Sequence, residues 1–595
     1  MPAEYAIGVD LGTTNSVLSF TRLDSEVPQP EAFPLTQIVA AHTTEALPSL
    51  PSFCYLASET EMKEGALDLP WVNGRSYGVG RWAKTRSADQ PDRTVGAAKS
   101  WLSHAGVNRR DSILPWNAPS EVEKISPLTA SQRYLEHLVD AWNLEHPGSL
   151  FGDQKIVLTV PASFDPVARD LTREAALAAG FPPDFVLLEE PQAAVYSWLN
   201  QQGEDWRKRL KVGETILVCD VGGGTTDLTL IRVVDERGDL SLQRVAVGKH
   251  LLVGGDNMDL SLAFLAAELF REKGIQLDPW QSVSMWHSCR QAKENLLAAD
   301  GQDSEQISVL GRGSKLIGGT VSVEMKRQVA SQLLLDGFVP FCGLDELPTS
   351  QPASGFQEIG LPYESDPAIT KHVAEFLNHH CAEDGNICLP DHVLFNGGVF
   401  KADGFRQRLL AVFDQWSGTS TSIRELSDNA ELDHAVSRGA CYYAWTKERG
   451  GTRIRGGVPS AYYVGIETSG LAIPGAPRPL KALCVVPFGM EEGTELEVAS
   501  EEIGLVLGQP VRFRFFGSSV RKSDTPGYLL SNWESGELFE TDPLEATFQS
   551  SEDDPTGYVP VRFESRITEL GMFELWCVSR KADEKWKLQF SVRED

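Results

Sequence analysis

The sequence predicts an α/β fold over most of its length, followed by an all-β C-terminal domain. In the first part, apolar runs of strand length alternate with longer segments whose apolar residues recur at helical spacing. After residue 459, short segments such as VRFRFFG and FELWCVS alternate apolar and polar residues. The 595 residues exceed what one hydrophobic core uses. We therefore expect a first unit over residues 1–447, a linker over 448–459 and a β-rich domain over 460–595.

Two glycine-containing turns are each expected to join a pair of strands. The segment YAIGVD (5–10) is followed by the turn LGTTN and by a second apolar run, SVLSF (16–20). The segment TILVCD (215–220) is followed by VGGGTT and by DLTLIRV (227–233). A strand rather than a helix follows each turn, so both segments predict hairpins. The chain thus contains twice the same arrangement of an apolar strand ending in Asp, a Gly/Thr turn and a returning strand.

The segments between these hairpins alternate strands with helices. DQKIVLTVPASF (153–164) predicts a strand, and residues 165–181 predict a helix that ends near Gly180. FVLLEEPQAAVYSWL (185–199) predicts a strand that passes into a helix, with Pro191 in the first helical turn. This alternation indicates an α/β core.

Two further glycine pairs stand where a helix is expected to begin. Gly254 and Gly255 precede an amphipathic segment, and Gly397 and Gly398 follow the strand-like run HVLFN. Free backbone N–H groups at a helix start can hold phosphate or the sugar of a nucleotide. Residues 336–367, between the two pairs, are rich in Pro and Gly and predict a surface loop or insertion.

Composition excludes several classes of protein. The net charge of -29 argues against nucleic-acid or anionic-membrane binding, and the apolar runs are too short and too charged to cross a bilayer. A strand that begins at Tyr5 leaves no room for a signal peptide, and nine scattered cysteines without CxxC suit a reducing compartment, so we expect a cytoplasmic protein. His379, His380, Cys381 and Cys388 could form a metal site, but their spacing fits no usual zinc pattern and favours a helix end and a loop.

The triplet Gly222, Gly223 and Gly224 could belong to three kinds of phosphate site. A dinucleotide fingerprint would need glycine in place of Asp227 and a helix after it, and a P-loop motif is absent. The remaining alternative is a hairpin turn whose amides and threonine hydroxyls hold phosphate, with Asp at the strand end holding water on a magnesium ion. Two such hairpins facing each other would clamp one nucleotide.

Six motifs in this order resemble the nucleotide-binding domain of the 70-kilodalton heat-shock chaperones of the DnaK type, in the actin-like ATPase superfamily. They are IGVDLGTTNSV, TVPASF, EEPQAA, DVGGGTTDLTL, GGDNMD and NGGVF. The resemblance covers residues 5–445. It implies a fold of two lobes, each built on a mixed sheet flanked by helices, with ATP and Mg²⁺ in the cleft between them and monovalent cations such as K⁺ nearby.

The resemblance also implies roles for individual residues. Nucleotide-binding roles fall on Gly12, Thr13, Thr14, Asn15, Gly222, Gly223, Gly224, Gly254, Gly255, Lys293, Gly397, Gly398 and Asp433. Catalytic roles fall on Lys84, Glu190, Asp220 and Thr225, with Lys84, Glu190 and Asp220 positioning the attacking water. Asp10, Asp220 and Asp227 would hold the water shell of the magnesium ion. Pro161 and Arg169 would couple the nucleotide state to the neighbouring domain.

The sequence departs from the family pattern in three places. Around the adenine ring Lys293 matches, whereas Arg290, Glu294 and Leu297 do not, so the stacking arginine expected at Glu294 is missing. The linker RIRGGVPSAYYVGIET lacks the family's run of leucines between aspartates, so we do not expect apolar docking of the linker in the same form. No helical lid segment follows the β-rich domain, which predicts fast release of bound peptides.

The resemblance therefore predicts a slow, stress-related chaperone ATPase that controls binding of unfolded or extended polypeptide by the β-rich domain. A J-domain co-chaperone and an exchange factor would be its partners. The altered adenine pocket and linker favour an alternative, a nucleotide-gated adaptor, co-chaperone or assembly protein with a dedicated protein partner. A sugar kinase of the same superfamily fits less well, because those enzymes carry no such β-rich domain.

Overall fold

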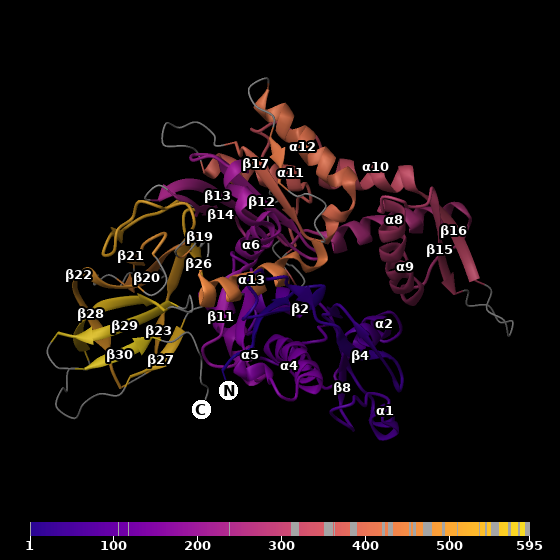
Figure 1. Cartoon of the computed structure of the whole chain (residues 1–595), viewed down its shortest axis with the longest axis horizontal. Coiled ribbons are helices and arrows are strands. Elements are labelled where there is room, and N and C mark those ends of the chain that lie inside the picture. Colours follow the sequence, from indigo (N-terminus) through magenta and orange to yellow (C-terminus); the bar gives the residue numbers. More distant parts are fainter. Residues whose placement is uncertain are drawn as a thin grey trace, which may run out of the picture.

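The computed structural model contains two mixed sheets with their helices and a group of C-terminal strands (Figure 1). Mixed α/β content, as the sequence predicts, is therefore confirmed. The residues that the structure describes are 2–104, 106–116, 118–236, 239–310, 320–349, 361, 363–380, 389–418, 423–426, 432–450, 454–455, 458, 460–467, 479–490, 494–508, 510–534, 536–541, 544–548, 558–568, 573–580 and 584–588.

The first sheet has the strand order β11-β10-β1-β2-β3, with β6 paired to β2. β1 and β2 form the predicted antiparallel hairpin, and β10 and β11 continue the sheet in parallel. The strands of this half are β1 (Tyr5–Leu11), β2 (Asn15–Arg22), β3 (Glu31–Ala32), β4 (Leu35–Ala40), β5 (Thr43–Leu47), β6 (Leu50–Pro51), β7 (Cys54–Leu56), β8 (Tyr77–Val79), β9 (Thr94–Val95), β10 (Lys155–Val160) and β11 (Val186–Glu189). Its helices are α1 (Glu59–Glu64), α2 (Arg81–Asp89), α3 (Ala98–Ser103), α4 (Pro127–Glu145) and α5 (Pro166–Ala178).

The second sheet has the strand order β18-β17-β12-β13-β14-β19. β12 and β13 form the second predicted hairpin, and β17 lies parallel to β12. The strands of this half are β12 (Thr215–Val221), β13 (Thr226–Glu236), β14 (Asp239–Val247), β15 (Ser304–Leu310), β16 (Thr320–Lys326), β17 (His392–Asn396), β18 (Arg424–Glu425) and β19 (Ile454–Arg455). Its helices are α7 (Trp206–Arg209), α8 (Gly255–Glu272), α9 (Pro279–Leu297), α10 (Arg327–Phe338), α11 (Ile369–His379) and α12 (Asp403–Ser417).

Two helices lie between the sheets and join them. They are α6 (Glu190–Gln202) and α13 (Ala435–Arg449). Both contribute to one buried cluster that also contains residues of β1, β10, β12 and β13. Helix α13 packs closely on β1 and on α6, and two glycines make this possible. A Cβ added at Gly8 of β1 would lie 2.2 Å from the backbone nitrogen of Cys441, and one added at Gly439 would lie 1.7 Å from the carbonyl oxygen of Ala193. The strand β1 and the helix α6, which both lead to the candidate site, are thus held through α13.

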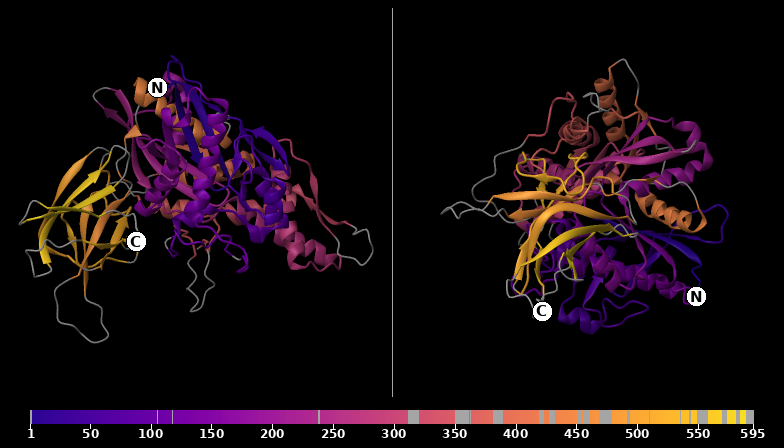
Figure 2. Two further views of the ribbon diagram at one scale, coloured as in Figure 1. Left: turned by 90° about the horizontal axis from the view of Figure 1, so that it is seen from below. Right: turned by 90° about the vertical axis from the view of Figure 1, so that its left-hand side faces the viewer.

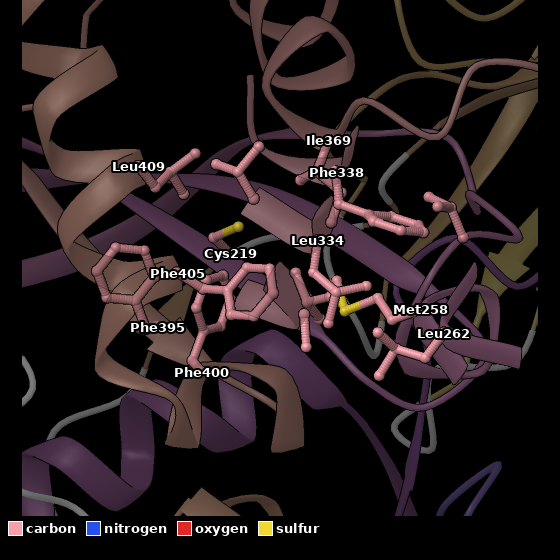
Figure 3. Close-up of a cluster of buried hydrophobic side chains, with 14 of the residues drawn as sticks. Cys219, Met258, Leu262, Leu334, Phe338, Ile369, Phe395, Phe400, Phe405 and Leu409 are labelled. Atoms are coloured by element: carbon pink, nitrogen blue, oxygen red, sulfur yellow. The ribbon is translucent and has the colours of Figure 1, made fainter. Parts of the chain in front are cut away.

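The apolar core of the second half brings together side chains from α8, α10, α11, β17 and α12 (Figure 3). Phe395, Phe400 and Phe405 lie on one side of this cluster, and Met258 and Leu262 on the other. Met258 and Phe405 also line the cavity described below. Packing of this core therefore fixes one wall of the candidate site.

All described elements after residue 460 are strands, gathered at one end of the molecule (Figure 2). They are β20 (Ala461–Glu467), β21 (Leu480–Val486), β22 (Glu495–Val506), β23 (Pro510–Phe513), β24 (Phe515–Ser518), β25 (Leu529–Leu530), β26 (Phe539–Glu540), β27 (Leu544–Thr547), β28 (Tyr558–Ile567), β29 (Phe573–Ser579) and β30 (Lys585–Leu588). Val167 of α5 packs against their core, and the Lys522 ammonium donates a hydrogen bond to the carbonyl of Val245 at 2.8 Å. The C-terminal strands thus contact both halves of the preceding part.

Two local features refine the expected structure. Within the described part of the Gly/Arg-rich linker, Ile454 is buried and pairs with Leu242 at the edge of the second sheet, a contact that the sequence does not predict. Gly398 opens a single 3₁₀ turn, and the following helix α12 begins only at Asp403. A single apolar residue between two arginines is a weak local signal for a strand, so strand pairing at Ile454 depends on the sheet edge that receives it.

Some expectations lie partly outside the described residues. Cys381 and Cys388, considered above as metal ligands, lie outside them, as do residues 350–360 of the predicted insertion. Within the described part of 339–367, no helix or strand is formed. Among the described helices, none has the length and apolar character needed to cross a membrane.

Candidate active site

A cavity of about 440 Å³ opens where the turns of the two hairpins meet. A Cβ added at Gly223 would lie 2.0 Å from the hydroxyl of Thr14, and one at Gly224 would lie 3.2 Å from the methyl of Thr13. The two turns therefore lie against each other, which the repeated sequence pattern predicts. Backbone amides and threonine hydroxyls at such turns can hold an anionic phosphate.

Most residues singled out from the sequence line this cavity. They are Asp10, Gly12, Thr13, Thr14, Asn15, Lys84, Glu190, Asp220, Gly222, Gly223, Thr225, Asp227, Gly255, Lys293, Gly397, Gly398 and Asp433. Gly224 lies behind the lining, against Thr13. Gly254 also lies behind it, where a Cβ would stand 2.8 Å from the carbonyl oxygens of Gly222 and Gly223.

Four carboxylates and one lysine converge at the base of the cavity. Asp10, Glu190, Asp220 and Asp227 all line it, and Lys99 of α3 forms a buried ion pair with Glu190. Burial, together with the nearby Asp10 and Asp220, raises the pKa of Glu190 to about 8. Burial also raises the pKa of Asp220 to about 7, against a hydrogen bond of 2.7 Å from the Asn396 amide. One lysine does not neutralise four acids, so the base of the cavity can accept a further cation.

Asp227 differs from the other three acids. The hydroxyl of Ser163 donates to its Oδ1 at 2.6 Å, and Nδ1 of His250 lies 3.2 Å from the same oxygen. Burial alone would raise the pKa of Asp227, but His250, Ser163 and Lys99 outweigh burial and lower it. Sequence reasoning did not identify Ser163 or His250, although Ser163 lies within the quoted TVPASF motif.

The structure pairs Glu190 with Lys99 and not with Lys84, although Lys84 also lines the cavity. Lys84 lies on α2, where burial and the nearby guanidinium of Arg290 lower its pKa. Lys99 takes the position beside Glu190, and the charges of Glu190 and Asp10 raise its pKa although burial opposes this. Both lysines lie within residues 78–102, and the family resemblance led to Lys84 rather than Lys99.

The wall beyond Lys84 carries the residues that depart from the family pattern. Arg290 forms ion pairs with Asp256 and with Asp259, the latter at 2.7 Å, and Lys293 contacts the other oxygen of Asp259 at 2.7 Å. The apolar residues that line the cavity are Leu297, Ala298, Val399, Ala402, Phe405, Leu432 and Val436. The cavity can therefore accept an apolar ring, with the Arg290 guanidinium held by the two aspartates.

The two predicted coupling residues, Pro161 and Arg169, lie outside the cavity lining. Arg169 donates to the carbonyls of Ala162 and Phe164 and pairs at 2.9 Å with Glu189, which also pairs with Arg244 of β14. Tyr462 of β20 is buried near Arg169 and Arg244, and burial raises its pKa. This cluster connects both sheets to the C-terminal strands.

The donor set fits a magnesium ion held with a phosphate ligand. Carboxylate and hydroxyl oxygens are the ligands that Mg²⁺ prefers, usually together with several waters. Within the described residues, no three His, Cys, Asp or Glu side chains close around one point, so the protein would hold the ion largely through water and phosphate. The Asn396 amide oxygen is buried at the cavity and has no hydrogen-bond partner in the described part of the chain, so it can also accept from a ligand.

Comparison with known proteins agrees with this geometry. Residues 75–337 match the family model described as Hsp70 protein. The chain is 29% identical over 275 residues to the chaperone protein DnaK of Thermosipho melanesiensis, a match that covers 46% of this chain and 38% of that relative. It is 28% identical over 325 residues to a chaperone protein HscA homolog of Bordetella petrii, covering 51% of this chain and 45% of the relative. The chain thus spans less than half the length of these curated relatives. The matches show that the chain is similar to chaperones of the Hsp70 family over part of its length.

Proposed function

We propose that the chain is an ATP-dependent chaperone of the Hsp70 type, in which slow ATP hydrolysis in the cavity controls polypeptide binding by the C-terminal strands. The observation that carries this proposal is the buried Lys99–Glu190 pair, placed among three aspartates where two Gly/Thr turns meet. Such an arrangement suits phosphoryl transfer, which depends mainly on positioning and electrostatic stabilisation rather than on a covalent nucleophile.

The proposed binding residues follow from the cavity lining. The turn amides and hydroxyls of residues 12–15 and 222–225 hold the phosphates, and Gly255, Lys293, Gly397, Gly398 and Asp433 border the adenosine. Asp10, Asp220 and Asp227 hold the water shell of Mg²⁺ and a neighbouring K⁺ ion. When bound, Mg²⁺ neutralises charge on the phosphates. Lys84 takes a place at the adenosine-side wall instead of the catalytic role.

The proposed catalytic residues are Glu190, Asp220, Lys99 and Thr225. Glu190 and Asp220 accept hydrogen bonds from the attacking water and orient it toward the γ-phosphoryl group. Lys99 and the Thr225 hydroxyl face the negative charge that develops on the transferred group. These contacts strengthen as charge develops, which is what lowers the barrier.

The proposed coupling runs through the cluster formed by Arg169, Glu189 and Arg244. These residues bridge the first sheet, the second sheet and Tyr462 of the C-terminal strands. A change in the angle between the sheets would alter these contacts and release the strands for polypeptide. We propose residues 1–447 as a two-lobed actin-like ATPase domain, 448–459 as the linker and 460–595 as the polypeptide-binding domain. The protein would act in the cytoplasm with a J-domain partner and an exchange factor.

Two measurements on the whole chain test the function. Phosphate release from ATP and the affinity for a fluorescent extended peptide, with ATP or ADP, are compared for wild type and Glu190→Ala. We expect wild type to hydrolyse ATP and to bind peptide more weakly with ATP. We expect the variant to bind ATP but to lose hydrolysis by about 100-fold. Wild type that neither hydrolyses ATP nor changes its peptide affinity would contradict the chaperone function.

A nucleotide-gated adaptor or assembly protein is the second candidate. The guanidinium of Arg290 forms ion pairs with Asp256 and Asp259 and is therefore not free to stack on the adenine ring. This favours a mode of nucleotide binding that differs from that of the family. Sedimentation with ATP and with ADP distinguishes the two functions. Nucleotide-dependent assembly without any effect on peptide would support the adaptor.

A further inference from the structure

Ser163 and His250 both contact the carboxylate of Asp227, and the proposed function gives these two residues no role. We propose that they are positioning residues that fix the Asp227 carboxylate as the anchor for the cation accompanying the bound phosphates. The inference rests on the proposed nucleotide function, because it concerns the same cavity.

Both contacts fall on one oxygen of the carboxylate. Ser163 Oγ donates to Asp227 Oδ1 at 2.6 Å, and His250 Nδ1 lies 3.2 Å from that oxygen and 3.0 Å from Ser163 Oγ. Asp227 lines the cavity, and within the described residues no hydrogen bond reaches its Oδ2. The carboxylate is therefore held at one oxygen, while the other remains available to a cation or to the water around it.

His250 is itself held in place. Its side chain is 15% exposed, and the ring of Phe164 contacts it edge to face with centroids 5.9 Å apart. Its Nε2 is buried without a hydrogen-bond partner in the described part of the chain, so the polar contacts of this ring are made through Nδ1. The contact through Nδ1 therefore fixes the position of the imidazole beside Asp227 and Ser163.

The contact joins the two halves of the molecule. Ser163 lies between β10 and α5 of the first half, whereas Asp227 belongs to β13 and His250 follows β14 in the second. Separation of the halves would remove Ser163 from Asp227 but leave His250 beside it. Cation affinity should therefore depend on the closed arrangement of the two sheets.

The test measures binding of Mn²⁺ with ADP to the whole chain, by electron paramagnetic resonance of free Mn²⁺, and separately the affinity for ADP without metal. The variants are Ser163→Ala, His250→Gln and their combination, with Ser163→Thr keeping the hydroxyl. The matched control is His392→Gln, because His392 is a buried histidine paired with a carboxylate, Glu214, at 3.0 Å outside the cavity lining.

We expect Ser163→Ala and His250→Gln each to raise the Mn²⁺ dissociation constant about 3- to 10-fold, the change that one lost hydrogen bond allows. The Mn²⁺ dissociation constant of the double variant should rise by less than the product of the two single changes, because both residues act on one oxygen. ADP affinity without metal, Ser163→Thr and His392→Gln should stay within about twofold of wild type.

Equal Mn²⁺ affinity in wild type, Ser163→Ala and His250→Gln would overturn the inference and leave the proposed function standing. A loss of metal-free ADP affinity equal to the loss of Mn²⁺ affinity would also overturn it, since the residues would then support the cavity generally. Wild type that binds no ADP, with or without Mn²⁺, would overturn the proposed function and this inference with it.

Discussion

Lys99 of α3 and Glu190, the first residue of α6, form a buried ion pair that joins two elements 91 positions apart in the chain. Asp10, Asp220 and Asp227 line the same cavity, so the cluster holds four acids around one lysine. An excess of buried negative charge disfavours the ionised acids and favours a bound cation. The charges of this cluster therefore affect both the stability of the ligand-free protein and its affinity for metal and phosphate.

The first prediction concerns stability and pH in the absence of ligand. The pKa of Glu190 rises from 4.5 to about 8 in the folded protein, so the folded state binds more protons between these values and its stability falls as pH rises through them. The Glu190→Gln side chain does not ionise, so the variant should not lose stability in this way as the pH rises. We expect its free energy of unfolding to exceed that of wild type by on the order of 1 kcal/mol at pH 8.5 and by much less at pH 5.5.

Urea titration of the ligand-free protein at both pH values measures this difference. Glu272→Gln, which removes one negative charge outside the cavity, is the control and should parallel wild type. A Glu190→Gln variant whose stability also parallels wild type would show that the buried acid does not govern the pH dependence.

The second prediction concerns the packing of α13 on α6. A Cβ at Gly439 would lie 1.7 Å from the backbone oxygen of Ala193, and backbone atoms of a packed helix cannot move away cheaply. We expect Gly439→Ala to destabilise the protein by about 3 kcal/mol and to lower nucleotide affinity, since α6 carries Glu190. Gly337→Ala, in an exposed helical position with no atom near the added Cβ, should be neutral or stabilising by up to about 1 kcal/mol.

Thermal unfolding compares the two variants with wild type. Equal melting temperatures for Gly439→Ala and Gly337→Ala would mean that α13 can shift without cost. The packing account of how α6 is positioned would then be incorrect.

The third prediction concerns the segment after α13. The backbone N–H of Ile454 donates to the hydroxyl of the fully buried Tyr196 on α6 at 2.8 Å. Tyr196→Phe leaves this N–H without its acceptor, which costs about 1 kcal/mol and loosens β19 from β14. We expect trypsin to cut after Arg455 about fivefold faster in the variant.

Mass spectrometry of timed trypsin digests gives the cleavage site and rate. Tyr442→Phe on the neighbouring α13 is the control, with cleavage at the wild-type rate. Unchanged cleavage in Tyr196→Phe would show that the hydroxyl does not hold the segment.

The sequence predicts both hairpins and the α/β alternation, because these depend on local patterns that each strand and turn carries. The family resemblance predicts most of the cavity lining. The sequence does not distinguish Lys84 from Lys99, since the two lysines occupy one segment and only the packing of α3 brings Lys99 to Glu190. Ser163 and His250 are missed for a similar reason, because they stand 87 positions apart and meet only in the folded chain. Pairing of Ile454 with β14 depends on a sheet edge far away in sequence.

The central claim is that Lys99, and not Lys84, supports ATP hydrolysis. ATP hydrolysis in a single turnover, with ATP affinity measured separately, is compared for wild type, Lys99→Ala and Lys84→Ala. The account predicts that Lys99→Ala lowers the hydrolysis rate by about 100-fold with ATP still bound, and that Lys84→Ala changes affinity by less than about 10-fold while hydrolysis continues. Hydrolysis that survives in Lys99→Ala and is lost in Lys84→Ala would contradict the account.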